Sequence, residues 1–167
     1  DRETLGFALR SGYRITELLS QSWEYTLRQD KITDIPANAS LAVKEQAGDF
    51  ITSSIGQTIL YDKRNNRFSP KKGYFLKMRN TVAGFGGDSQ YVRNDWSGGT
   101  YHQIAEKWIL SVVGGAGYIV GLGKDIRIID RFFLGGDSLR GFEVSGVGPR
   151  DLTTGDSIGG NWFYRST

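Results

Sequence analysis

The stretch FLGGDSLRGFEVSGVGPR, residues 133–150, carries glycine at positions 135, 136, 141, 146 and 148. Glycine at this density lets a backbone adopt positive φ angles and fold back tightly on itself. Apolar side chains are interleaved with these glycines, which distinguishes the stretch from a flexible Gly/Ser linker. We therefore predict an ordered loop over about residues 122–156 that folds inside a larger structure, with Arg140 as its polar anchor.

Outside this loop, apolar and polar residues alternate along the chain. Leu5, Phe7 and Leu9 share one side of the first such segment, whereas Thr4 and Arg10 share the other. A period of two predicts β-strands with one apolar face. The seven predicted strands cover about residues 4–13, 18–28, 51–61, 74–85, 90–101, 107–120 and 158–166.

The connections between these strands differ in length. Residues 14–16 make a short turn, whereas the polar residues 29–49 make a long loop in which residues 37–46 could form a short helix. Residues 62–73, DKRNNRFSPKKG, have the composition of a turn. Short turns on one rim and long loops on the other are typical of a transmembrane barrel, as are strands about twice the ~5–6 residues usual in globular proteins.

Alternation alone leaves two architectures open. In a soluble β-sandwich, such as a lectin-like binding module, the apolar face points inward, whereas in a membrane barrel it points to lipid and the charged residues line a wet lumen. Strand length and the aromatic residues near strand ends favour the barrel. The predicted fold class is therefore all-β, an antiparallel transmembrane β-barrel, present here as an incomplete segment of about seven strands with an inward-folded loop.

Composition argues against several other functions. The 21 basic residues are scattered and the net charge is only +3, so we expect no nucleic-acid partner. The chain has no cysteine and a single histidine, His102, so no metal site is expected, and no catalytic residue, cofactor or nucleotide site can be identified. A small basic cluster at Lys63, Arg64, Lys71 and Lys72 is either a solvated face or a contact to lipid phosphate.

Three motifs carry a resemblance to a known family. Leu139, Arg140, Gly141 and Phe142 resemble the arginine-glycine-aromatic signature in the sixth extracellular loop of the BamA superfamily of outer-membrane assembly and translocation barrels. Residues 132–138 and 145–149 resemble the flanks of that loop, and residues 159–161 resemble the opening of the twelfth strand. The flank positions are Gly135, Gly136, Asp137, Gly146, Gly148 and Pro149. Residues 62–73 are similar to the periplasmic turn between the eighth and ninth strands, through Asp62, Asn65, Asn66, Phe68, Pro70 and Gly73.

The resemblance implies that residues 1–167 form a single partial barrel domain, corresponding to about the sixth to twelfth strands of a sixteen-stranded barrel. It implies a non-enzymatic function, the folding and insertion of β-barrel proteins into the outer membrane of a Gram-negative bacterium. The implied partners are outer-membrane lipids, unfolded β-barrel clients and, through periplasmic domains that are not in this sequence, accessory lipoproteins. It also implies that Arg140 ties the loop to the lumen wall through acidic partners outside this chain. A related secretion or translocation pore is the alternative.

Overall fold

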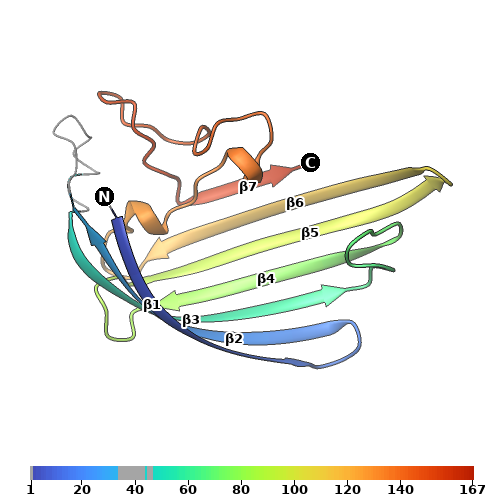
Figure 1. Cartoon of the computed structure of the whole chain (residues 1–167), viewed down its shortest axis with the longest axis horizontal. Helices are drawn as coiled ribbons and strands as arrows, with labels where there is room; N and C mark the ends of the chain where they lie inside the picture. Colours follow the sequence, from blue (N-terminus) through green and yellow to red (C-terminus); the bar gives the residue numbers. More distant parts are fainter. Residues whose placement is uncertain (1, 34–43, 45–46) are drawn as a thin grey trace.

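The computed structural model describes residues 2–33, 44 and 47–167. Seven strands form one antiparallel sheet in which sequence neighbours are also spatial neighbours (Figure 1). All seven predicted strands are present, and the strands are β1 (Arg2–Arg14), β2 (Leu19–Ile32), β3 (Gly48–Asp62), β4 (Gly73–Ala83), β5 (Tyr91–Ala105), β6 (Trp108–Gly121) and β7 (Trp162–Ser166). The helix considered for residues 37–46 falls, apart from residue 44, outside the described residues.

Two boundaries differ from the predicted ones in an informative way. Strands β2 and β3 continue past the apolar alternation, because their backbones stay paired as far as Ile32 and Gly48. Strand β7 begins at Trp162 rather than at Ile158, because residues 158–161 belong to the loop, where Gly160 bridges to Phe132.

The register separates two chemically different faces. Leu5, Trp23, Leu76 and Trp162 lie on one face and are 76%, 44%, 48% and 69% exposed. In the described part of the chain, no second sheet covers this face, as a sandwich would require. The opposite face carries most of the strand charges, including Arg10, Glu24, Arg28, Arg79 and Arg93.

The connections also divide between two rims. Residues 15–18, 63–72 and 106–107 join strands at one rim, which we call the short-turn rim. Strand β2 ends and β3 begins at the other rim, where residues 84–90 and 122–161 also join strands. Two connections depart from the division expected for a membrane barrel, because residues 63–72 form a longer turn than their two neighbours and residues 84–90 are a short connection at the other rim.

The sheet is not closed, since β1 and β7 are its two edges. Its buried apolar cluster is small and consists of Ala83, Tyr91 and Ile119 from the polar face together with Phe132 from the loop. Among the residues that the structure describes, no helix has the length and apolar character needed to cross a bilayer. The sheet therefore buries apolar area against its own loop, at Phe132.

Candidate functional site

The loop of residues 122–161 lies on the polar face of the sheet and is held there by Asp130. This residue ends a short 3-10 turn, η1 (Ile128–Asp130), and is only 4% exposed. Its Oδ1 accepts a hydrogen bond from Arg28 Nη2 of β2 at 3.1 Å. Its backbone carbonyl accepts a second one from Arg93 Nη1 of β5 at 3.0 Å. One loop residue is thus bonded to two strands that are far apart in the sheet.

Arg28 connects this contact to the wall. Its Nε lies 2.6 Å from Asp30 Oδ2 in the same strand, so the guanidinium is shared between two carboxylates. Burial raises the pKa of Asp130, and the positive charge of Arg28 opposes that rise. The ion pair with Arg28 therefore offsets part of the cost of burying a charged carboxylate on this face.

An aromatic contact lies beside the ionic one. The Phe132 ring packs against Phe163 of β7 with centroids 4.7 Å apart, and the Arg93 guanidinium lies 4.1 Å from the Phe132 centroid. Gly117 of β6 makes room for both rings, because a Cβ there would lie 2.7 Å from the Phe163 ring and 3.0 Å from Phe132 Cζ. Gly117 thus marks a place where another segment can approach the strand closely.

Two further contacts hold the loop, one near its start and one near its middle. The Arg127 guanidinium lies 3.2 Å from the centroid of the Phe50 ring in β3. Arg165 of β7 donates a hydrogen bond to the backbone carbonyl of Ser138. Together with Asp130 and Phe132, these contacts form what we call the loop anchor: Arg28, Phe50, Arg93, Phe163 and Arg165 on the wall, and Arg127, Asp130, Phe132 and Ser138 on the loop.

The signature residues are placed differently. Arg140 is exposed and has no hydrogen bond or ion pair with the residues that the structure describes. Phe142 is 55% exposed, and Gly141 has a φ of +90°. Leu139 follows η2 (Gly136–Ser138) in an extended conformation. The anchoring role of Arg140, whose expected acidic partners lie outside this chain, therefore remains a prediction.

The glycines flanking the signature explain how the loop folds on itself. Gly135 has a φ of +130°, and a Cβ there would collide with the Glu143 carbonyl oxygen. Gly136 donates its N–H to the Phe142 carbonyl at 2.9 Å, and Leu134 forms an isolated β-bridge with Val147. The loop is thus ordered by its own backbone hydrogen bonds, as its mixture of glycine and apolar residues predicted.

The remaining flank positions have separate places. Gly146 lies against Glu143, since a Cβ there would be 2.8 Å from the Glu143 carbonyl oxygen. Gly148 has a φ of +140°, and the Pro149 carbonyl accepts a hydrogen bond from Ile158 N at 3.1 Å. Asp137 is exposed.

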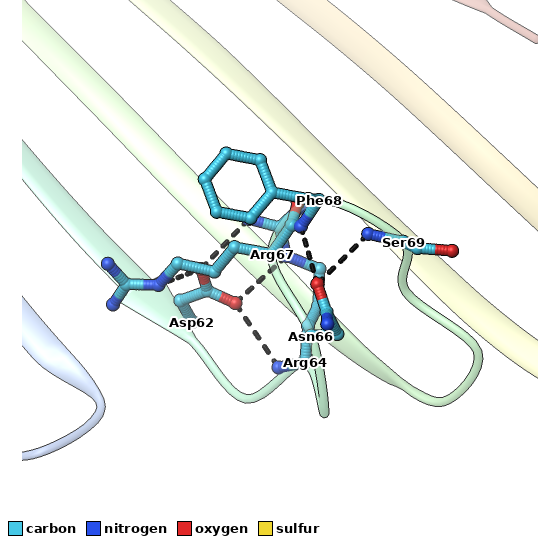
Figure 2. Close-up of polar contacts among 6 residues, drawn as sticks. All are labelled: Asp62, Arg64, Asn66, Arg67, Phe68 and Ser69. Atoms are coloured by element: carbon cyan, nitrogen blue, oxygen red, sulfur yellow. Dashed lines mark hydrogen bonds and ion pairs between the residues drawn. The ribbon is translucent and has the colours of Figure 1, made fainter.

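The turn at residues 63–72 is the second group of predicted site residues (Figure 2). The Asp62 carboxylate is buried and accepts two hydrogen bonds from Arg64, from Nε at 2.9 Å and from Nη2 at 2.8 Å. Arg67 Nε lies 3.3 Å from the same carboxylate. The hydrogen bonds from its guanidinium to Asp62 raise the pKa of Arg64. Asp62 thus organises the turn from inside.

Two asparagines complete the turn. Asn65 Oδ1 accepts the backbone N–H groups of Lys71 and Lys72, both at 3.0 Å. Asn66 Oδ1 accepts those of Phe68 and Ser69 at 2.8 and 3.0 Å. Side-chain amides that bind nearby backbone in this way hold tight turns.

The remaining predicted residues of the turn, Phe68, Pro70 and Gly73, differ sharply in exposure and in backbone conformation. Gly73 has a φ of +105°, and a Cβ there would collide with the Lys63 carbonyl oxygen, which is why glycine is required. Pro70 is partly buried. Phe68, at the tip, is 99% exposed.

The polar face also holds a groove of about 550 Å³ next to the loop anchor. Its lining includes the cations Arg28, Lys77, Arg79, Arg93 and Arg165 and the acids Glu24, Asp95 and Asp130. In the described ranges, no group of three or more His, Cys, Asp or Glu side chains is arranged to hold a metal ion. This surface can hold charged or hydrogen-bonding groups of a loop, of water or of a polypeptide.

Sequence reasoning missed most of the loop anchor. The alternation did place Arg28 on the polar face, but it did not place Arg93, and it gave no indication that Asp130 would meet either residue. Asp130 follows two isoleucines in a stretch without alternation, and Arg28 lies 102 residues before it. Only the position of Phe132 in the loop flank could have pointed to this contact.

The chain forms a single sheet whose apolar face is uncovered and whose charged face holds a long folded loop. These features define a segment of a transmembrane β-barrel wall. The family comparison makes this specific. The family model of the Omp85 superfamily domain matches residues 1–167, and the chain belongs to that superfamily.

Individual relatives agree with this assignment. The chain is 36% identical over 157 residues to outer membrane protein assembly factor BamA of Neorickettsia risticii, covering 93% of this chain and 21% of that protein. It is 32% identical over 145 residues to the human sorting and assembly machinery component 50 homolog, covering 85% of this chain and 30% of that protein. The crystal structure of BamA from Haemophilus ducreyi lacking POTRA domains 1–3 has the same fold, with a TM-score of 0.84 at 19% identity over 99% of this chain and 36% of that one. The chain thus spans about a fifth to a third of the length of the relatives it matches.

Proposed function

We propose that this chain is the central wall and the inward-folded loop of an outer-membrane assembly factor that folds and inserts β-barrel proteins. The observation that carries the proposal is the loop of residues 122–161, which is docked onto the polar face through Asp130 and Phe132. The loop bears the signature residues 139–142, and the chain is 36% identical to a protein named as such a factor.

The mechanism that this build supports is physical rather than covalent. A membrane-embedded sheet offers strand edges and a disturbed bilayer to an incoming chain, whose backbone N–H and C=O groups become paired as it enters. The share of residues 1–167 in this process is to keep the loop inside the barrel against the wall. We propose no nucleotide, metal or cofactor.

The proposal includes a location and partners. The relatives include proteins from bacteria and from animals. We propose that this chain lies in the outer membrane of a Gram-negative bacterium, surrounded by outer-membrane lipids. Its clients would be unfolded β-barrel proteins, delivered with the help of accessory lipoproteins bound to other parts of the complete protein.

The test is reconstitution of the complete protein into liposomes. An unfolded β-barrel client is added, and its folding is followed by protection from protease and by heat-modifiable migration. We expect folding to be faster with the protein than with empty liposomes of the same lipid. If the protein conducts ions in planar bilayers but leaves client folding at the rate of empty liposomes, it is a secretion pore and the proposal is wrong.

A further inference from the structure

The turn of residues 63–72 presents a feature that the barrel wall does not require. Phe68 is 99% exposed, although four backbone N–H groups of the turn donate hydrogen bonds to the side chains of Asn65 and Asn66. Figure 2 shows the two that Asn66 accepts, from Phe68 and Ser69. A flexible loop could hide such a ring, but this one is kept in the open. Large aromatic side chains on rigid supports are the usual anchors of protein interfaces.

The surroundings of Phe68 are strongly basic. Lys63, Arg67, Lys71 and Lys72 are all exposed. The one acidic residue between positions 62 and 73 is Asp62, which is buried and used by Arg64 and Arg67. The turn therefore shows a partner an apolar ring surrounded by positive charge, which fits a negatively charged partner.

The turn leans towards the polar face rather than towards lipid. Asp62 pairs in register with Phe75, and both side chains belong to the polar face. The Arg64 guanidinium lies 4.6 Å from the centroid of the Phe75 ring, so the start of the turn folds over that face. The short-turn rim of a membrane barrel opens to the periplasm. The ring and its cations thus stand at the aqueous mouth of the barrel.

We propose that residues 63–72 form a docking site for an acidic, unfolded polypeptide segment, with Phe68 contacting an apolar side chain of that segment and Lys63, Arg67, Lys71 and Lys72 contacting its carboxylates. The segment would belong to an arriving client protein, so this inference rests on the proposed function. The first contact between the barrel wall and the incoming chain is then made at the short-turn rim.

The test uses the complete protein in nanodiscs of zwitterionic phosphatidylcholine. The probes are three short fluorescent peptides: one with alternating Glu and Leu, its Lys-for-Glu counterpart, and one with Glu and Ser. Binding is measured by fluorescence anisotropy. We expect the Glu/Leu peptide to bind best and to lose affinity as salt screens the charges.

The variants separate the ring from the charges. Phe68→Ala removes the aromatic anchor and should weaken binding of the Glu/Leu peptide about tenfold or more. The double variant Lys71→Glu and Lys72→Glu should weaken it and flatten its salt dependence. Lys107→Glu, at the exposed turn between β5 and β6 on the same rim, is the matched charge control and should leave binding unchanged. Because Phe68 and the two lysines are exposed, these variants should fold as the wild type does.

Three results would overturn the docking site. The first is that all variants bind the Glu/Leu peptide as tightly as the wild type. The second is that the wild type binds the Lys-containing peptide as tightly as the Glu/Leu peptide. The third is that the variants lose only binding to anionic phosphatidylglycerol nanodiscs, which would make the turn a membrane-surface element. Client folding in liposomes is measured in parallel. If clients fold but the turn variants bind the peptide as the wild type does, the docking site is wrong and the proposed function stands. If the peptide binds as expected but clients do not fold, the docking site stands and the proposed function is wrong.

Discussion

At the level of single residues, Asp130 has the contacts that best explain why the loop stays on the wall. It is buried, and it bonds β2 through its side chain and β5 through its backbone. Its carboxylate lies next to an arginine that is itself partly exposed and shared with Asp30. The loss of Asp130 therefore removes one contact without leaving the guanidinium of Arg28 alone.

Replacement of Asp130 with alanine should release the loop from β2. Because Arg28 keeps Asp30, we expect a loss of roughly 1–3 kcal/mol, the cost of one buried partner, rather than that of an isolated buried charge. The measurements are urea unfolding of the complete barrel and protease cleavage within residues 122–161. Asp125→Ala, an exposed residue of the same loop, is the control. Unchanged cleavage in Asp130→Ala would show that the ion pair does not hold the loop.

Arg140 makes a separate prediction, which depends on the complete barrel. If the guanidinium pairs with carboxylates of later strands, Arg140→Ala should loosen the loop and slow client assembly. Arg140→Lys should restore the charge but not the two-pronged hydrogen bonding, and so should restore function only in part. Assembly at the wild-type rate with unchanged protection of the loop from protease would contradict the anchor.

These two residues show what a sequence reveals at this scale. Arg140 stands in a recognisable four-residue signature, so it could be singled out without a structure. Asp130 stands in no motif, and its partner lies on another strand far away along the chain. A contact of this kind depends on how the loop returns to the wall, which local sequence does not specify.

At the level of elements, the contact between the loop and β6 depends on the absence of a side chain. Gly117 faces Phe132 and Phe163, and there is no space for a Cβ. Gly117→Ala should push the Phe132 ring away and cost roughly 1–3 kcal/mol, as overpacking usually does. The measurement is the free energy of unfolding together with protease cleavage of the loop.

Gly56 supplies the matched control for this glycine. It lies on the polar face of β3, and the nearest atom to a Cβ there is 3.7 Å away, an ordinary contact. Gly56→Ala should therefore leave loop protection unchanged. Equal effects of the two substitutions would indicate a general intolerance of the strands to alanine rather than a contact with the loop.

The strands themselves were the most predictable elements. Alternation with a period of two is a direct consequence of side chains pointing to opposite faces, so all seven strands could be found. Their ends were less predictable, because the pairing of Ile32 with Gly48 depends on backbone hydrogen bonds and not on apolar side chains. The same reason explains β7, where Gly160 pairs with Phe132 of the loop before the strand begins.

At the level of the whole molecule, the sheet has the polarity of a membrane wall. The charges that lie on its outward face, such as Glu3, Lys31 and Asp49, are near the ends of strands at one rim. Midway along the strands, that face is mainly apolar, although it also carries amides such as Gln57 and Asn80. Sequence alternation could not decide whether this face was buried in a sandwich or exposed to lipid, and the fold shared with BamA of Haemophilus ducreyi decides it.

The last prediction follows from this polarity. Met78 lies at the middle of β4 on the outward face, paired with Ile59 and Trp96. Met78→Arg should destabilise the complete barrel in a bilayer by ~2–4 kcal/mol, because an arginine at mid-depth meets hydrocarbon. Ser22→Arg, on the polar face of β2, should have little effect, because that face is wet. Both are measured as unfolding free energies in the same lipid, and a smaller loss for Met78→Arg than for Ser22→Arg would reverse the assignment of the two faces.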